Sequence, residues 1–172
     1  MREEKEHPAI KKIEQAFPGV INKVISALGE TGIVIDKNYI KKVCRFLKQD
    51  EDLGFNHLSD LCGVDYLGKK EPRFEVVYQL YSTKIHERLR LKVEVGEGES
   101  VDTVTDLWAG ANWHERECRE MFGINFEGHP DLRRLLTIEE FDGFPLRKDY
   151  PLMGKAEIVE GQEGGVQWQK RG

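Results

Sequence analysis

The chain has 172 residues, of which 39% are hydrophobic, and a formal net charge of -5. This length suits one domain with extensions, and mild acidity with scattered basic residues argues against general nucleic-acid binding. No apolar run approaches the roughly 20 residues that a membrane span needs, and the N-terminus lacks the character of a signal or transit peptide. We therefore expect a protein that is made and kept in the cytoplasm or an equivalent compartment.

The three cysteines, Cys44, Cys62 and Cys118, lie far apart and form no C-x-x-C pair. Such spacing indicates neither a disulfide framework nor a local iron-sulfur motif, and neither G-x-G-x-x-G nor a P-loop occurs. We interpret the cysteines as reduced, mostly buried small hydrophobic residues and expect no cofactor, cluster or metal to be bound by this chain.

The first expected element is a short amphipathic helix over residues 7–17. Its apolar side chains recur at helical spacing, at Ile10, Ile13 and Phe17, and Pro18-Gly19 ends it.

Residues 20–28 fit two patterns. Val20, Val24 and Leu28 are spaced as on a helix, whereas the β-branched residues and the glycine turn that leads into residues 33–35 are typical of a hairpin. We predict two strands here. A helix with one apolar stripe toward a sheet is then predicted to begin after Asp36.

The sheet is clearest in residues 74–81 and 88–95, where apolar and polar side chains alternate. Residues 55–66 are predicted as a third strand, and residues 82–87 as the turn between the clear pair. The economical architecture is an α+β fold of two layers in the order α-β-β-α-β-β-β, with a largely antiparallel or mixed sheet. A helix and an extended C-terminal arm follow it.

The helix after the sheet is predicted from its ends. Asn112 is a good N-cap, Glu115 stands three residues later as in a capping box, and Gly123 follows Phe122 as a C-terminal stop. On a helical wheel that starts at Trp113, one half of the helix collects the apolar side chains together with His114 and Glu117. The charged half contains Glu115, Arg116, Arg119 and Glu120.

This wheel makes Glu117 a special residue. A carboxylate on a covered face must find a cation or hydrogen-bond donors, so we predict that Glu117 pairs with an arginine of the arm or of a partner. Glu117→Ala should then cost about 3 to 5 kcal/mol, whereas Glu120→Ala should be nearly silent. Glu115 and Arg119 are expected to form an exposed i,i+4 pair.

The chain divides into three predicted parts. Residues 1–122 form a compact domain that ends with the charged helix, and residues 123–152, punctuated by proline and glycine, form an extended arm that docks on a partner protein. Residues 153–172 are a Gly-rich tail with too few apolar residues for a core, disordered or bound to a partner. Trp168 is a candidate anchor in this tail.

Two histidines invite a catalytic interpretation. The run His114-Glu115-Arg116-Glu117-Cys118 begins like a zincin helix, but H-E-x-x-H needs a second histidine where Cys118 stands. His129, between Gly128 and Pro130, fits a turn in which the ring donates to the backbone better than a catalytic role. A free-standing metal-dependent hydrolase using His114, Glu115 and His129 is the enzyme alternative.

The basic residues of the arm stand in two groups, Arg133-Arg134 and Arg147-Lys148. Phosphate or carboxylate ligands suit such cations, but no Gly-rich strand-to-helix loop accompanies them. We prefer ion pairing with the carboxylates of a neighbouring protein, because the planar fork of arginine gives directional pairs.

Several runs carry a family resemblance. They are Glu115-Arg116-Glu117, Met121-Phe122-Gly123-Ile124, Phe126-Glu127-Gly128-His129-Pro130-Asp131-Leu132-Arg133-Arg134 and Pro145-Leu146-Arg147-Lys148-Asp149-Tyr150-Pro151-Leu152. The chain resembles the C subunit, the thirty-kilodalton type, of the NADH:quinone oxidoreductases of respiratory complex I. The similarity covers roughly residues 30–152. Arg119, where an aromatic or aliphatic residue is expected, and the tail after Met153 depart from the pattern.

The resemblance implies a cofactor-free, by itself non-catalytic member of the peripheral arm of a proton-translocating complex. It implies that FMN, iron-sulfur clusters and quinone are bound by partners, of which the D subunit, the forty-nine-kilodalton type, is the chief neighbour and the B and I subunits lie near. The complex would lie on the cytoplasmic side of the bacterial inner membrane, and the chain would reach the membrane only through it. The expected interface or structural residues are Glu115, Arg116, Glu117, His129, Arg133, Arg134, Arg147 and Lys148. The equivalent subunit of a membrane-bound hydrogenase or another complex I-like oxidoreductase is the alternative.

Overall fold

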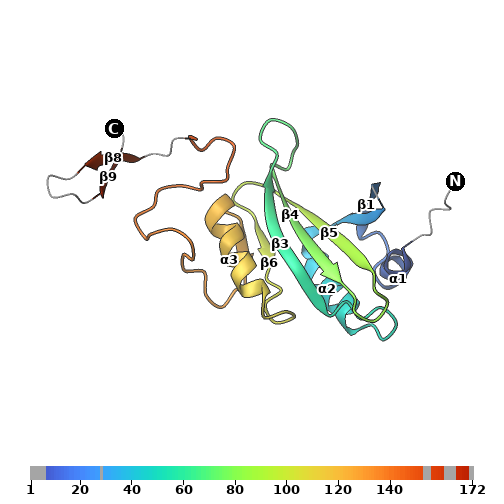
Figure 1. The fold of residues 1–172 in the computed structure, drawn as a ribbon. Coiled ribbons are helices and arrows are strands. Elements are labelled where there is room, and N and C mark those ends of the chain that lie inside the picture. Colours follow the sequence, from blue (N-terminus) through green and yellow to red (C-terminus); the bar gives the residue numbers. More distant parts are fainter. Residues whose placement is uncertain (1–6, 28, 153–155, 161–165, 171–172) are drawn as a thin grey trace.

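The computed structural model describes residues 7–27, 29–152, 156–160 and 166–170 (Figure 1). In chain order the elements are α1 (Pro8–Ala16), β1 (Ile21–Ala27), β2 (Glu30–Ile35), the 3-10 turn η1 (Lys37–Tyr39), α2 (Ile40–Gln49), β3 (His57–Asp65), β4 (Phe74–Tyr81), β5 (Arg88–Val95), β6 (Ser100–Asp102), α3 (Ala111–Phe122), β7 (Asn125–Glu127), β8 (Ala156–Glu160) and β9 (Val166–Lys170).

The main sheet has five strands in the order β1-β2-β5-β4-β3. The pairs β1/β2, β3/β4 and β4/β5 are antiparallel, whereas β2 and β5 run parallel, with Ile33 opposite Leu91. The predicted α+β fold with a mixed sheet is therefore confirmed, as is the predicted element order up to β5. Residues 21–27 form a strand, which resolves the ambiguity of that segment in favour of the hairpin.

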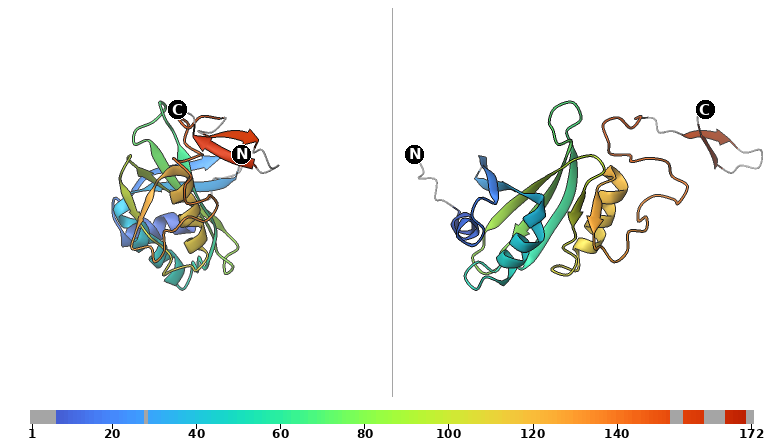
Figure 2. Two further views of the ribbon diagram at one scale, coloured as in Figure 1. Left: turned by 90° about the vertical axis from the view of Figure 1, so that its left-hand side faces the viewer. Right: turned by 180° about the vertical axis from the view of Figure 1, so that it is seen from behind.

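The core lies between the sheet and the helices α1 and α2, which lie on the same side of it (Figures 1 and 2). The stripe on α2 that faces the sheet consists of Ile40, Val43, Cys44 and Leu47, all fully buried. On β5, Leu89, Leu91, Val93 and Val95 point into this core, while the alternate residues are half-buried or exposed. The sheet therefore keeps a second, polar face that α1 and α2 leave open.

The helix α3 packs against the edge strand β3, and a glycine permits the contact. A Cβ atom on Gly63 would lie 2.6 Å from Cδ2 of Phe122 and 3.1 Å from Sγ of Cys118. Real Cβ atoms do not approach other heavy atoms so closely, so a larger residue at position 63 would push α3 away from the sheet.

Two further pairings lie outside the main sheet. The short strands β6 and β7 are parallel, and Phe126 of β7 and the preceding Ile124 are buried in the main core. β8 and β9 form an antiparallel pair in the tail, and the expected anchoring by the Trp168 side chain lies outside what the structure describes. Among the described helices, none is both long and apolar enough to cross a bilayer.

Candidate functional site

Two arginines of α3 bind the backbone of the arm. Nε of Arg116 donates to the carbonyl of Arg133 and its Nη2 to that of Arg134, both at 2.9 Å. Nη1 of Arg119 donates to the carbonyl of Leu132 at 3.1 Å. Within the described residues, Arg116, Arg119 and Arg134 have no carboxylate at ion-pair distance. The face of α3 that the wheel assigned to solvent therefore holds the arm.

Glu120 completes this attachment. Its carboxylate accepts hydrogen bonds from the amides of Leu135 at 2.6 Å, Leu136 at 3.0 Å and Thr137 at 2.6 Å, and from Oγ1 of Thr137 at 2.5 Å. Burial acts to raise the pKa of Glu120, but these donors outweigh it and hold the pKa below its usual value. The residue is 5% exposed. The predicted solvent position of Glu120 is wrong, because three consecutive amides of the arm supply what a charge needs when it leaves water.

Glu115 points into the core. Its carboxyl group accepts from the amide of Val104 at 2.8 Å and from Oγ1 of Thr103 at 2.5 Å, and it is fully buried. Burial raises the pKa of Glu115 to about 7, although both donors oppose the shift. The predicted exposed pair with Arg119 is therefore wrong. Glu115 secures the segment between β6 and α3 instead.

Glu117 is exposed, so the predicted buried ion pair of this residue is also wrong. The wheel was centred on Trp113, yet this ring is 56% exposed and lies 5.3 Å from the guanidinium of Arg116. The inward positions of α3 follow the spacing i, i+4, i+7 and i+11: Ala111, Glu115, Cys118 and Phe122. Because the exposed Trp113 was taken as an inward residue, the predicted buried face of the helix was rotated away from the true one.

His129 has the structural role that the sequence favours. Its Nε2 lies 3.2 Å from the carbonyl of Asn112, and its Nδ1 lies 3.0 Å from the amide of Asp131. A carbonyl can only accept, so Nε2 carries the proton and Nδ1 accepts from the amide. Burial lowers the pKa of His129, and the nearby cations Arg116 and Arg119 lower it further. The predicted turn with the ring donating to backbone is confirmed.

The end of the arm is held by Arg147. Its Nε donates to the carbonyl of Phe122 at 2.6 Å, and its Nη1 pairs with Glu97 at 2.8 Å. The guanidinium also lies over the rings of Phe144 and Phe74, at 4.3 and 5.0 Å from their centroids. Arg147 therefore joins the arm to the end of α3 and to the sheet.

A buried ion pair that sequence reasoning missed lies beside it. Arg73 binds Asp65 through two hydrogen bonds of 3.0 and 2.8 Å, and also binds Asp149 of the arm at 2.8 Å. Asp65 further accepts from the amide of Lys148 at 2.8 Å, while the lysine side chain makes no described contact. The hydrogen bonds from Arg73 lower the pKa of Asp65 to about 2. No periodic pattern marks these residues, because each stands at the end of a strand or in the arm.

The arm binds α3 largely through its backbone and leaves four of its apolar side chains exposed. Among the described residues 127–152, no residue is buried as a whole, although the side chain of His129 is. The exposed fractions are 60% for Leu136, 62% for Ile138, 51% for Leu146 and 101% for Leu152. A groove of about 630 Å³ lies between α3 and the arm, lined by Arg116, Leu132, Arg133, Arg134, Thr137, Ile138 and Glu139. The arm is therefore an ordered path with an uncovered apolar surface.

The residues of the hydrolase alternative do not converge. Glu115 and His129 approach to 4.0 Å with both side chains at 0% exposure, whereas His114 lies 3.5 Å from Asp60 instead. Within the described residues, no group of three or more histidine, cysteine, aspartate or glutamate side chains is placed to hold one metal ion.

Comparisons with known proteins agree on one family. The family described as "Respiratory-chain NADH dehydrogenase, 30 Kd subunit" matches residues 33–156. A protein of Rhizobium meliloti, named as the second C subunit of its NADH-quinone oxidoreductase, is 50% identical over 139 residues, covering 81% of this chain and 76% of that protein. The C subunit of the NADH-quinone oxidoreductase of Geobacter sulfurreducens is 46% identical, covering 85% of this chain and 90% of that protein.

Solved structures share the fold. "Nqo5 of the trypsin-resistant fragment (1-134)" is 36% identical with a TM-score of 0.62, covering 72% of this chain and 99% of that one. A chain of the membrane-bound sulfane sulfur reductase, "an archaeal respiratory membrane complex", is 21% identical with a TM-score of 0.70, covering 84% of both, and shows the same fold. From the family match and these relatives, the chain belongs to the family of the 30-kilodalton subunit, or C subunit, of the respiratory-chain NADH dehydrogenase, the NADH-quinone oxidoreductase.

Proposed function

We propose that this chain is the cofactor-free C subunit of a proton-translocating NADH:quinone oxidoreductase and does no bond chemistry itself. It holds its neighbours in place, because electron tunnelling and quinone reduction depend on their relative positions. FMN, the iron-sulfur clusters and quinone belong to the partner subunits. The complex lies on the cytoplasmic side of the bacterial inner membrane, and the chain reaches the membrane only through it.

One observation carries this proposal: the arm is ordered by α3, but Leu136, Ile138, Leu146 and Leu152 are uncovered. Arg116, Arg119 and Glu120 fix the backbone of residues 132–137. A segment that is already held in one conformation loses less entropy when a partner binds it. Leu136 and Ile138 then supply apolar area for the interface. The proposed chief partner is the D subunit, of the forty-nine-kilodalton type, with the B and I subunits nearby.

The charged residues around the arm serve the same interface in this proposal. Arg133 and Lys148 expose their side chains, and Glu117 stands on the outer side of α3. These three are the direct partner contacts that we propose. The others act within the chain: Arg116, His129, Arg134 and Arg147 shape the arm, and Glu115 holds the segment between β6 and α3.

We also propose the three-part division of the chain: a compact part over residues 1–122, an arm over residues 123–152 and a tail over residues 153–172. β7 adds the beginning of the arm to the packed core. The trypsin-resistant fragment of the relative named Nqo5 supports a compact N-terminal part, because this chain matches 99% of that fragment with 72% of its own length.

The test is affinity purification of the tagged full-length chain from native membranes, with identification of the proteins that accompany it. With the double variant Leu136→Asp, Ile138→Asp, the amount of D subunit that is recovered should fall at least tenfold, because two charges would enter an apolar interface. Val24→Asp is the matched control, since Val24 is also exposed, at 48%, but lies on β1. Equal recovery of the D subunit with both variants would contradict the proposal.

The same purification separates the two lineages. A nickel-containing protein among those that accompany the chain would favour the hydrogenase-type alternative, whereas FMN-containing and quinone-binding subunits would favour the proposed one. The likeness to the sulfane sulfur reductase chain supports only the shared fold at this level of identity.

A further inference from the structure

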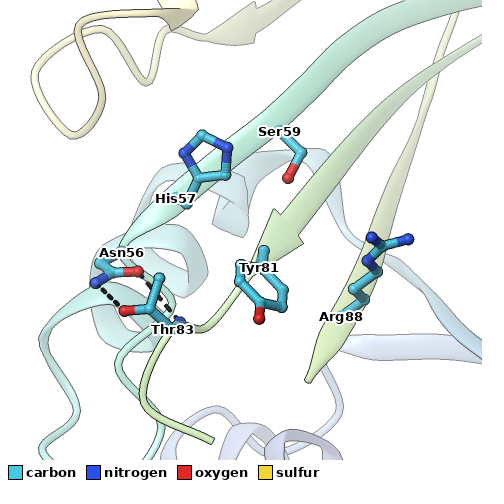
Figure 3. A pocket seen from close by; sticks show the side chains of 6 residues that line it. All are labelled: Asn56, His57, Ser59, Tyr81, Thr83 and Arg88. Atoms are coloured by element: carbon cyan, nitrogen blue, oxygen red, sulfur yellow. Dashed lines mark hydrogen bonds between the residues drawn. The ribbon is translucent and has the colours of Figure 1, made fainter. Parts of the chain in front are cut away.

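A polar pocket lies on the open face of the sheet, at the end where β3 begins and β4 ends (Figure 3). Its volume is about 660 Å³, and its lining residues are Asn56, His57, Ser59, Tyr81, Thr83 and Arg88. The arm meets the same two strands at their other end, at Asp65 and Arg73. Since β3 spans nine residues, the two places are about 25 Å apart.

The strand register assembles this pocket. His57 pairs with Tyr81, and Tyr81 pairs with Arg88, so the three side chains form one row across β3, β4 and β5. The register of β3 shifts between Leu58 and Asp60. A bulge of this kind inserts an extra residue and re-aims its side chain, and here it brings Ser59 beside His57 in the lining.

The walls of the pocket are braced. Nδ2 of Asn56 donates to Oγ1 of Thr83 at 2.7 Å, and the amide of Thr83 donates back to Oδ1 of Asn56 at 3.4 Å. On the other side, the hydroxyl of Tyr81 lies 3.1 Å from Nδ1 of His86. In the β4–β5 turn, the buried Oγ of Ser82 accepts from the amides of the next turn residues. The walls of the pocket are therefore held by hydrogen bonds within the chain.

The charge of the pocket is uncompensated. Further along the same face of β5, Arg90 pairs with Glu30 at 2.5 Å and Lys92 pairs with Glu75 at 2.8 Å. Within the described residues, the side chains of Arg88, His57 and Ser59 have no hydrogen-bond or ion-pair partner. No carboxylate lines the pocket. The pocket thus presents three donors, and its lining contains no negatively charged acceptor.

We propose that this pocket receives a carboxylate side chain of a second neighbouring subunit. The planar fork of Arg88 suits a bidentate pair with a carboxylate, and Ser59 and His57 supply further donors to its oxygens. The pocket is open to solvent, so the donors reach a group presented by another protein surface. The proposal rests on the proposed membership of a multisubunit complex, and makes the chain a bridge between two neighbours, one at the arm and one at the opposite end of the sheet.

The test uses the assembled complex purified from native membranes with an Arg88→Lys variant. A carbodiimide joins an amine to a carboxylate only when the two are in direct contact, so the introduced amine should yield an amide cross-link to an aspartate or glutamate of one neighbouring subunit. Arg90→Lys is the matched control, because its partner Glu30 belongs to the same chain and gives only an internal product. The cross-linked peptides are identified by mass spectrometry.

An intersubunit product found with Arg88→Lys but not with wild type or Arg90→Lys supports the proposal. Its absence from an intact complex, or its equal yield in all three proteins, overturns it. Arg88→Glu should reduce retention of the cross-linked neighbour at least tenfold, while the D subunit is retained and the melting temperature of the chain is unchanged. If wild type itself brings no subunits along, the proposed function fails. If wild type and Arg88→Glu assemble equally, only the pocket proposal fails.

Discussion

Three carboxylates of α3 stand within six residues of each other and meet three different environments. Glu115 lies in the core, Glu117 in solvent and Glu120 against the arm. The three are the same residue type, so their own hydrophobicity does not explain why their environments differ. The separation arises from the donors that the neighbouring segments present, since a carboxylate leaves water only where hydrogen-bond donors replace it.

Glu120→Ala should weaken the attachment of the arm, because the amides of residues 135–137 would lose their acceptor. Unmet charged hydrogen bonds of this kind cost about 1 to 3 kcal/mol. Glu117→Ala is the control, and should change the free energy of unfolding by less than about 0.5 kcal/mol. Chemical denaturation of both variants, with hydrogen exchange over residues 132–137, measures the difference. Indistinguishable variants would show that Glu120 does not hold the arm.

Glu115 should make stability depend on pH between about 4.5 and 7. Its pKa is raised in the folded protein, so the folded state holds the proton that the unfolded state has already released. The free energy of unfolding therefore falls as pH rises through this window, by about 3 kcal/mol for a shift of this size, and is level above it.

Glu115→Gln should remove this loss, because a neutral amide keeps the shape and accepts from Val104. Relative to wild type, the variant should gain about 3 kcal/mol on going from pH 4.5 to pH 7.5. Melting curves across this range provide the measurement. Glu115→Ala, which deletes both hydrogen bonds, should be destabilised at every pH. Parallel pH profiles of wild type and Glu115→Gln would mean that Glu115 is ionised throughout.

At the residue scale, the buried face of α3 could have been predicted from the sequence, although the helical wheel centred on Trp113 missed it. Ala111, Cys118 and Phe122 form a stripe at i, i+7 and i+11, and Glu115 falls in it at i+4. That stripe is a detectable signal for the true phase of α3. The acceptor role of Glu120 had no such signal, because its donors are backbone amides fifteen to seventeen residues away.

At the scale of elements, the junction between α3 and the arm depends on Gly123. Its φ of 76° is left-handed, and a Cβ there would lie 2.6 Å from Nη2 of Arg147 and 2.7 Å from Cζ of Phe144. Gly123→Ala should therefore lose stability both through the backbone conformation, about 1 kcal/mol, and through displacement of these side chains, about 1 to 3 kcal/mol more.

Gly98→Ala separates these two costs. Gly98 has a similar φ of 79°, but nothing lies within 4 Å of the Cβ that would be added. Denaturation of both variants should show the larger loss for Gly123→Ala, together with faster hydrogen exchange in the arm. Equal losses would mean that Arg147 and Phe144 adjust without cost.

The regular elements were predictable where one periodicity extends over many residues. The alternation along β5 and the stripe on α2 predicted their faces correctly, because each buries one side against the same core. For β4 the predicted half-buried pattern is wrong over residues 74–78, where Glu75 and Val77 of the opposite face are buried as well. The strands β6 and β7 were not predicted. Each has three residues, and they pair in parallel across the whole of α3, so neither alternation nor a turn signal marks them.

At the scale of the whole molecule, the arm should be the part that a protease attacks first in the isolated chain. The side chain of Arg133 is 84% exposed, and the backbone beside it is held by hydrogen bonds from Arg116 of α3 and by the local bond from the amide of Arg133 to Asp131. Trypsin should cleave there in the isolated chain, and slowly or not at all in the complex, where a partner covers the arm. Timed digestion followed by mass spectrometry compares the two. Equal resistance of the arm in both would contradict docking.

The parallel pairing of β2 with β5 also affects the order in which a ribosome can complete this fold. Residues 32–35 of β2 leave the exit tunnel long before residues 90–93 of β5, with which they must pair. During that interval the β1–β2 hairpin has no central strand to join, and an isolated two-stranded ribbon is marginally stable in water. The later strands β3, β4 and β5 follow one another through short turns and can pair as they emerge. During synthesis we therefore expect β3, β4 and β5 to pair first. The β1–β2 hairpin then becomes the last part to join the five-stranded sheet.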